Sequence, residues 1–268
     1  MQECATVPVF QIEDRTFTRL ILGHNPLLGY SYLSHARCRE YAERFATYEP
    51  IRDVIVAALR MGVRSIMISP GGEQSDRVAQ AIEAAQEHTG ITMSNLVIVG
   101  PDIPSQMDYL KRVGCQVCLV HGQVTDSMFW RAEWTFRPEF AELLAAIRAA
   151  GFVPGMSSHN GGETVPVAER FDVQVINTPV NKIAWRMCPC VEQVLEAVRR
   201  STRKIIAMKP LAMGRIAPQE ALEYALQVPG VDALCIGIAT PAEAEETFAI
   251  GAEVLARTGC TNGRGASA

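Results

Sequence analysis

Residues 204–247 read KIIAMKPLAMGRIAPQEALEYALQVPGVDALCIGIATPAEAEET and contain two similar units in succession. Each unit begins with a short, continuously apolar run, at 204–209 and at 232–237. Such a run is typical of a strand that is buried on both faces of a parallel sheet. Apolar residues at helical spacing follow each run, at 217–227 and 241–255. The stretch therefore predicts two parallel strands, each followed by a helix.

The same unit recurs along the rest of the chain. The other apolar runs lie at 19–23, 63–69, 95–100, 115–121, 152–158 and 172–177. The other helical patterns centre on 50–61, 75–87, 104–112, 137–150, 163–169 and 190–200. Eight such units without a linker predict one closed (β/α)8 TIM barrel of the α/β class. We expect this single domain to span 1–257, with a disordered tail at 258–268.

A hairpin is predicted before the first barrel strand. VPVFQI (7–12) and RTFTRL (15–20) flank Glu13 and Asp14, which read as a tight turn. We expect this hairpin to close the bottom of the barrel and to contribute packing.

The composition excludes several classes of protein. Of the 268 residues, 48% are hydrophobic and 20% are charged, and the net charge is −4, which gives no electrostatic footprint for nucleic acid or an anionic membrane. No apolar run reaches the roughly 18 residues of a membrane span, and the N-terminus lacks the features of a signal peptide. We therefore expect a soluble, cytoplasmic protein that acts on a small molecule, with its oligomeric state left open.

The cysteines indicate a reduced protein, because the eight are scattered over a long chain. Cys115 and Cys118 form a CxxC pattern on a predicted strand, where their side chains should point to opposite faces. Cys188 and Cys190 flank a proline in a predicted loop, and their role stays open.

Polar residues at the strand ends are the candidates for chemistry, because barrel active sites lie at the carboxyl ends of the strands. His24, His121 and His159 follow the first, fourth and fifth strands. These three histidines, with Glu73 or Asp102, are candidate ligands for a divalent metal ion. The alternative is that each histidine is a hydrogen-bonded structural residue.

Lys209 ends the seventh strand, where burial would lower its pKa and suit it to proton transfer or Schiff-base formation. Its alternatives are an ion pair with Glu73 or Asp102, or a contact with a substrate anion. The long loop after the first strand suggests a specificity loop, in which Tyr32 is a further candidate. The candidate substrate contacts are Asn25, Tyr30, His35 and Asn177.

Several segments resemble the aldo-keto reductase superfamily in barrel order. These are CQVCLVHG (115–122), VINTPVN (175–181), IAMKPLAMGRI (206–216) and CIGIATPAEAEET (235–247). The resemblance implies that His121 is the catalytic histidine. It also implies NAD(P)H binding by Met213, Gly214, Arg215, Gly237 and Thr240.

The resemblance fails at three of the four catalytic positions that it implies. Ser69 stands where the aspartate is expected, and no tyrosine occurs between Tyr48 and Tyr109. Glycine and aspartate, at 100 and 102, stand where the lysine is expected, so that only His121 remains. We therefore expect a divergent protein that lacks most of the reductase tetrad.

The leading hypothesis is a metal-assisted lyase, isomerase or hydrolase that acts on a small polar carbonyl or sugar-like substrate. His24, His121 and His159 would hold the metal, and Lys209, Glu73 or Asp102 would move the proton. The alternative is a divergent NAD(P)H-dependent aldo-keto reductase that uses His121 and Lys209. A Schiff-base aldolase and a non-catalytic ligand-binding barrel are further alternatives.

Overall fold

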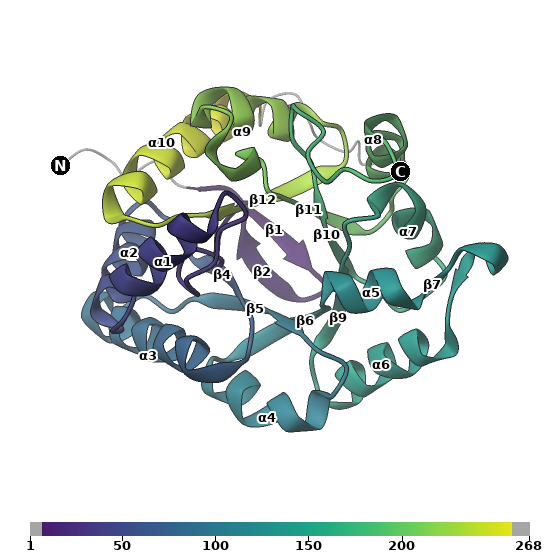
Figure 1. The fold of residues 1–268 in the computed structure, drawn as a ribbon, viewed down its shortest axis with the longest axis horizontal. Coiled ribbons are helices and arrows are strands. Elements are labelled where there is room, and N and C mark those ends of the chain that lie inside the picture. Colours follow the sequence, from purple (N-terminus) through teal and green to yellow (C-terminus); the bar gives the residue numbers. More distant parts are fainter. Residues whose placement is uncertain (1–6, 259–268) are drawn as a thin grey trace.

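The computed structural model describes residues 7–258, and these form the predicted closed barrel of eight parallel strands (Figure 1). The strands follow one another around the barrel in chain order, and the last strand pairs with the first to close it. The strands are β3 (Leu20–Gly23), β4 (Ser65–Ile68), β5 (Ser94–Val99), β6 (Cys115–Val120), β9 (Val153–Ser157), β10 (Val175–Pro179), β11 (Lys204–Met208) and β12 (Val231–Gly237). The tail predicted at 258–268 lies outside the described residues, except that Thr258 ends the last helix.

Two apolar layers hold the barrel together, because successive side chains of a strand point to opposite faces. In β6, Val117 and Leu119 pack inside the barrel, whereas Cys118 and Val120 pack against the surrounding helices. The continuous apolar runs in the sequence are explained by this burial on both faces.

The predicted N-terminal hairpin consists of β1 (Val9–Ile12) and β2 (Arg15–Thr18). Phe10, Ile12 and Phe17 are buried in the same cluster as the side chains of the barrel interior. Each such side chain contributes about 1.5–3 kcal/mol on full burial. The hairpin therefore closes one end of the barrel, and it is visible through the barrel in Figure 1.

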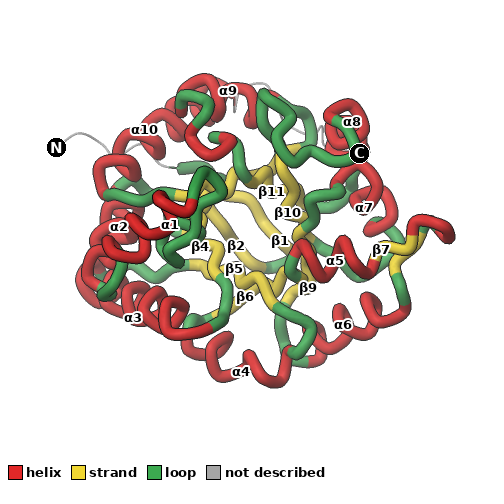
Figure 2. The backbone as a smooth tube through the Cα atoms, in the orientation of Figure 1, coloured by secondary structure: helices red, strands yellow, loops and turns green. Residues whose placement is uncertain are grey.

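Ten helices lie in the described part of the chain, and they surround the strands in Figure 2. The eight predicted ones are α2 (Glu49–Arg60), α3 (Gly72–Thr89), α4 (Ile103–Arg112), α6 (Pro138–Ala149), α7 (Gly161–Ala168), α8 (Val191–Arg200), α9 (Pro218–Gln227) and α10 (Pro241–Thr258). No helix in residues 7–258 is long and apolar enough to span a membrane.

Two loops contain helices in addition to the eight predicted ones. The loop after β3 carries α1 (His35–Arg44), whose N-terminus is capped by the Ser34 side chain, and α1 buries no residue. The loop after β6 carries α5 (Gly122–Met128) and a small hairpin of β7 (Phe129–Trp130) and β8 (Thr135–Phe136). Because α1 has no buried face, its apolar periodicity is too weak to predict a helix.

The prediction that Cys115 and Cys118 point to opposite faces is wrong. Asn95 of β5 pairs with Cys115, but the next residue of β5 pairs with Val117, so Gln116 is an extra residue in β6. This bulge changes the alternation of side chains. It brings the two sulfur atoms to 3.6 Å, and burial raises the pKa of Cys115.

Candidate active site

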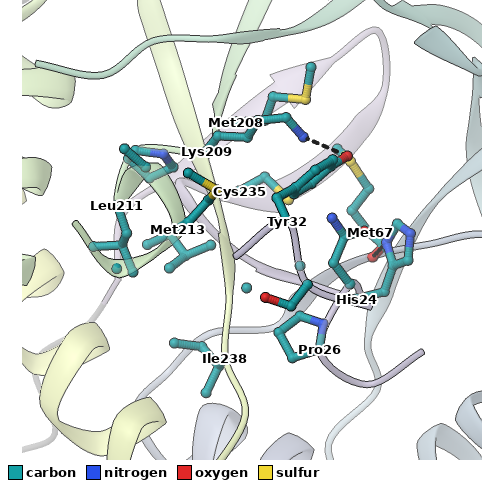
Figure 3. Close-up of a pocket in the computed structure, with 18 of the residues that line it drawn as sticks. His24, Pro26, Tyr32, Met67, Met208, Lys209, Leu211, Met213, Cys235 and Ile238 are labelled. Carbon is teal, nitrogen blue, oxygen red and sulfur yellow. Dashed lines mark hydrogen bonds between the residues drawn. The ribbon is translucent and has the colours of Figure 1, made fainter. Parts of the chain in front are cut away.

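A cavity of about 450 Å³ opens at the carboxyl ends of the barrel strands. Met67, Ile98 and Met208 line it within the barrel. Beyond the strand ends the cavity continues along the loop after β11 and reaches the start of α10, where Glu243 and Glu246 line it. The cavity thus joins the barrel interior to the start of α10. Figure 3 shows Met67, Met208 and Lys209 among the residues that line it.

Lys209 directly follows β11 and lines this cavity. Its Nζ donates a hydrogen bond to the Tyr32 hydroxyl at 3.2 Å and lies 4.4 Å from the centroid of the Tyr32 ring (Figure 3). Burial lowers the pKa of Lys209 to about 8, and the neighbouring Arg186 charge lowers it as well. At pH 7 the amine is therefore mostly protonated, and it donates to the Tyr32 hydroxyl as an ammonium group.

Tyr32 is held over Lys209 by a cluster of aromatic and cationic groups. Its ring meets the Trp185 ring edge to face at 5.3 Å and the Tyr30 ring at 4.8 Å between centroids. The Arg186 guanidinium lies 5.0 Å from the centroid of the Tyr32 ring. Such contacts, each worth about 0.5–1.5 kcal/mol, fix the position of the hydroxyl.

His24 is a buried, neutral residue at the end of β3. Its Nδ1 lies 2.7 Å from the carbonyl oxygen of Met67, which can only accept, so Nδ1 carries the proton. Burial lowers the pKa of His24 to about 4, and the charge of Lys209 adds to this effect. Nε2 is then an acceptor, and the Ser69 hydroxyl lies 3.4 Å from it.

His121 has the opposite tautomer. It precedes α5, and its Nδ1 accepts a hydrogen bond from the backbone N–H of Gln123 at 3.2 Å. Burial lowers the pKa of His121, with further lowering by His159 and Lys209. The neutral ring therefore carries its proton on Nε2, which makes His121 a hydrogen-bond donor at the edge of the cavity.

His159 lies beside His121 and is anchored by Asp126 of α5. The Asp126 carboxylate accepts hydrogen bonds from the His159 backbone N–H at 3.1 Å and from the Ser158 hydroxyl at 2.5 Å. Gly122 lets the ring approach, because a Cβ there would lie 3.2 Å from His159 Nδ1. His159 Nε2 is buried without a hydrogen-bond partner among the described residues.

The predicted three-histidine metal site is not formed by the described residues. They contain no group of three or more His, Cys, Asp or Glu side chains placed to hold a metal ion. His24 Nδ1 is committed to a backbone carbonyl, and His121 Nδ1 to a backbone N–H. All three histidines line the cavity, but their side chains do not converge as a ligand set.

The two predicted acidic residues do not line the cavity. Glu73 is 82% exposed and pairs with Arg77 one turn later in α3. Asp102 is the N-cap of α4, where its carboxylate accepts from the Ser105 backbone N–H. Lys209 forms an ion pair with neither, so this alternative for Lys209 is wrong.

Asn177 and Ser157 form a buried amide–hydroxyl pair that lines the cavity. Asn177 Nδ2 donates to Ser157 Oγ at 2.8 Å. Asn177 Oδ1 has no hydrogen-bond partner among the described residues, and the Ser157 hydroxyl donates to none of them. The pair therefore offers one acceptor and one donor side by side.

The other predicted substrate contacts divide into two groups. Asn25 and Tyr30 line the cavity. His35 is exposed as the first residue of α1 and does not line it.

Some of the predicted cofactor residues line the cavity and others do not. Met213, Gly214 and Gly237 line the cavity, whereas Arg215 and Thr240 do not. The turn after β11 is unusual, because Ala212 and Met213 have positive φ values of 45° and 67° without being glycines. Thr240 instead caps α10, since its hydroxyl accepts from the Glu243 backbone N–H.

Trp185, Arg186 and Ser157 were not predicted as site residues. Ser157 had a detectable signal, because it is a polar residue at the end of an apolar run. Trp185 and Arg186 follow β10 in a loop, and their sequence context carries no sign that they meet Tyr32.

Comparison with known proteins gives matches in structure alone. No family model and no curated protein sequence matches the chain. A candidate aldo-keto reductase from Pseudomonas aeruginosa matches with a TM-score of 0.69 at 19% identity, over 95% of this chain and 98% of that one. An aldo-keto reductase from Bacillus halodurans matches with a TM-score of 0.61 at 12% identity, over 91% and 90%. A thermostable aldo-keto reductase solved with the inhibitor epalrestat gives 0.60 at 14%, over 91% and 93%.

These comparisons contradict the leading sequence-based hypothesis of a metal-assisted lyase, isomerase or hydrolase. The similar structures named above are all aldo-keto reductases or candidates for that activity, and the described residues form no metal-ligand group. The comparisons favour the reductase alternative instead. The chain has the (β/α)8 barrel fold of the aldo-keto reductase superfamily.

Proposed function

We propose that this protein is an NAD(P)H-dependent reductase of small carbonyl compounds. The observation that carries the proposal is the hydrogen bond between Lys209 and Tyr32, which faces the same cavity as the neutral His121. A phenol supported by an ammonium group, next to an imidazole donor, is suited to protonating a carbonyl oxygen. In this proposal Tyr32 supplies the acid group that the sequence lacks at the expected position.

Tyr32, Lys209 and His121 each have a separate role in the proposed reduction of the carbonyl. A bound nicotinamide would supply a hydride to the carbonyl carbon. Tyr32 gives its hydroxyl proton to the carbonyl oxygen, which becomes the alcohol, and the Lys209 ammonium compensates the charge left on Tyr32. His121 donates from Nε2 to the same oxygen and polarises the carbonyl. Solvent then restores the proton of Tyr32 by way of Lys209.

The Asn177–Ser157 pair fits the carboxamide of a nicotinamide ring. A carboxamide has an NH2 donor and a carbonyl acceptor. Asn177 Oδ1 is a buried acceptor without a partner, and the Ser157 hydroxyl is an uncommitted donor next to it. A buried unpaired acceptor costs about 1–3 kcal/mol, which a ligand donor would recover.

The turn after β11 fits the phosphate groups of the cofactor. Leu211 has right-handed helical backbone angles, whereas the next three residues have positive φ values. A right-handed residue followed by a left-handed one forms a backbone nest, which favours anion binding. The N–H groups of Ala212 and Gly214 donate to carbonyls within the turn, so Met213 would supply the backbone N–H for a phosphate. Met213 and Gly214 of this turn line the cavity.

The far end of the cavity favours NADH over NADPH. Glu243 and Glu246 line it there, and the Glu243 carboxylate accepts from the Ala239 backbone N–H at 2.8 Å. A carboxylate can accept from a ribose 2′-hydroxyl, but it repels a 2′-phosphate.

Titration of the protein with NADH and with NADPH tests the proposal, with nucleotide fluorescence as the readout. We expect saturable binding, tighter for NADH, that Asn177→Ala weakens about tenfold, in line with one lost hydrogen bond to a buried partner. Gln193→Ala removes an exposed amide of α8 outside the cavity and should leave binding unchanged. Absence of binding for both nucleotides would refute the proposed function.

A further inference from the structure

Two cations, Lys209 and Arg186, lie against the Tyr32 ring, although proton donation by Tyr32 requires only one. Lys209 Nζ lies 4.4 Å and the Arg186 guanidinium 5.0 Å from the centroid of the same Tyr32 ring. Among residues 7–258, neither cation forms an ion pair with an acidic side chain. Lys209 lines the cavity, whereas Arg186 lies beside the residues that line it, so two positive charges flank one ring at its rim.

Arg186 is held in place by the loop after β10. Its guanidinium also lies 5.6 Å from the centroid of the Trp185 ring, so two aromatic rings support its planar group. Stacking of this kind occupies the face of a guanidinium and leaves its N–H edges able to bind an anion. Arg186 is exposed, so a ligand can reach these edges.

The loop itself is braced by a buried amide. Asn181 is fully buried, its Nδ2 donates to the Trp185 carbonyl at 2.9 Å, and its Oδ1 accepts from the Trp185 N–H at 2.8 Å. Ala184 and Arg186 both have φ of 57°, a conformation that costs about 1–3 kcal/mol in a residue other than glycine. The buried amide therefore maintains a strained turn that keeps Arg186 against Tyr32.

We propose that Arg186 and Lys209 bind a carboxylate on the carbonyl substrate, so that the natural substrates are oxo acids. The inference rests on the proposed reductase function and names its substrate class. Arg186 donates to the carboxylate at the rim, while the Tyr32 hydroxyl faces the carbonyl. A neutral carbonyl compound would leave the two cations uncompensated, and the site therefore selects against it.

Binding of the hydroxy acid mandelate, without nucleotide, tests the site separately from catalysis. Isothermal titration calorimetry compares mandelate with mandelamide, its neutral analogue. We expect mandelate to bind at least tenfold more tightly than mandelamide. Arg186→Gln should weaken mandelate binding at least tenfold and mandelamide binding less than twofold, and Arg186→Lys should restore part of the difference. Lys182→Gln is the matched control, because Lys182 lies in the same loop but pairs with Glu220.

Three results would overturn the inference. The first is no preference for mandelate, including no binding of either compound. The second is an equal loss of both ligands in Arg186→Gln. The third is a loss of nucleotide binding, instead of mandelate binding, in Arg186→Gln, which would assign the anion to a cofactor phosphate. Selective mandelate binding in a protein that binds no nucleotide would support this site while refuting the reductase function.

Discussion

Lys209 and Tyr32 are 177 residues apart in the chain, yet the lysine Nζ lies 3.2 Å from the tyrosine hydroxyl. The lysine follows β11 and the tyrosine lies in the loop after β3, two strands that flank β12 in the barrel. The barrel thus brings an ammonium and a phenol together at the mouth of one cavity.

Removal of the Tyr32 hydroxyl should abolish most of the proposed activity. We expect Tyr32→Phe to lower kcat by about 10²–10⁴-fold, the usual contribution of a general acid, with little change in nucleotide affinity. Steady-state rates of NADH oxidation with phenylglyoxylate measure this. Tyr224→Phe alters a tyrosine of α9 outside the cavity and should retain full activity. Equal rates in both variants would exclude Tyr32 as the proton donor.

The activity should fall as the pH rises through about 8, where Lys209 loses its proton. Neutral Lys209 can no longer compensate the charge that forms on Tyr32. Lys209→Arg keeps the charge at every pH used, and we expect it to retain partial activity that persists above pH 8. A complete loss in Lys209→Arg, with trapping of wild-type Lys209 by borohydride and substrate, would indicate a Schiff base instead.

The buried Lys209 should lower the free energy of unfolding at neutral pH. The pKa of Lys209 is about 8 in the folded protein, whereas an unperturbed lysine, as in the unfolded chain, has a pKa of 10.5. Between pH 8 and pH 10.5 the unfolded chain therefore binds more protons than the folded protein. The free energy of unfolding therefore rises with pH across this window. We expect Lys209→Met to have a higher Tm than the wild type at pH 7, with a smaller difference at pH 10. Thermal denaturation at both pH values measures this, and a lower Tm at pH 7 would contradict it.

His24 and His121 should be neutral in opposite tautomers at pH 7. The Met67 carbonyl accepts from Nδ1 of His24, and the Gln123 N–H donates to Nδ1 of His121. Long-range ¹⁵N–¹H NMR spectra of protein labelled at its five histidines distinguish the two forms. His24 should show a protonated Nδ1 down to about pH 5, because burial lowers its pKa to about 4. Protonation of His24 near pH 6.5 would contradict the assigned environment.

Glu246 should contribute to a preference for NADH. It is exposed at the far end of the cavity, so its effect on a nearby 2′-phosphate is weakened by solvent. We expect Glu246→Gln to tighten NADPH binding about two- to fivefold and to leave NADH binding unchanged. The gain should shrink in high salt. An equal change for both nucleotides would place Glu246 away from the 2′ position.

The barrel was predictable because its signal is local. Each strand is an apolar run and each of eight helices an amphipathic segment, so the sequence pattern locates them without knowledge of their partners. The error at Cys115 and Cys118 arose where a bulge changes the register, since one extra residue leaves no mark in the apolar pattern.

The candidate site was predictable in position but not in orientation. The strand-end rule selected His24, His121 and Lys209, which line one cavity, but it also selected Glu73 and Asp102, which do not. The direction of each imidazole depends on single backbone groups, such as the Met67 carbonyl, which the sequence pattern does not specify. The contact between Tyr32 and Lys209 depends on a long loop folding back over the barrel, which periodicity does not predict either.

Hydride transfer in a single turnover tests the central claim most directly. Excess protein is mixed with phenylglyoxylate and with each of the two epimers of NADH that carry deuterium at C4, and the product is analysed by mass spectrometry. We predict mandelate with deuterium on the carbinol carbon from one epimer, formed at least about 100-fold more slowly by Tyr32→Phe. Formation of no mandelate with either epimer, or of mandelate without deuterium from both, would contradict the proposed reduction of oxo acids by this protein.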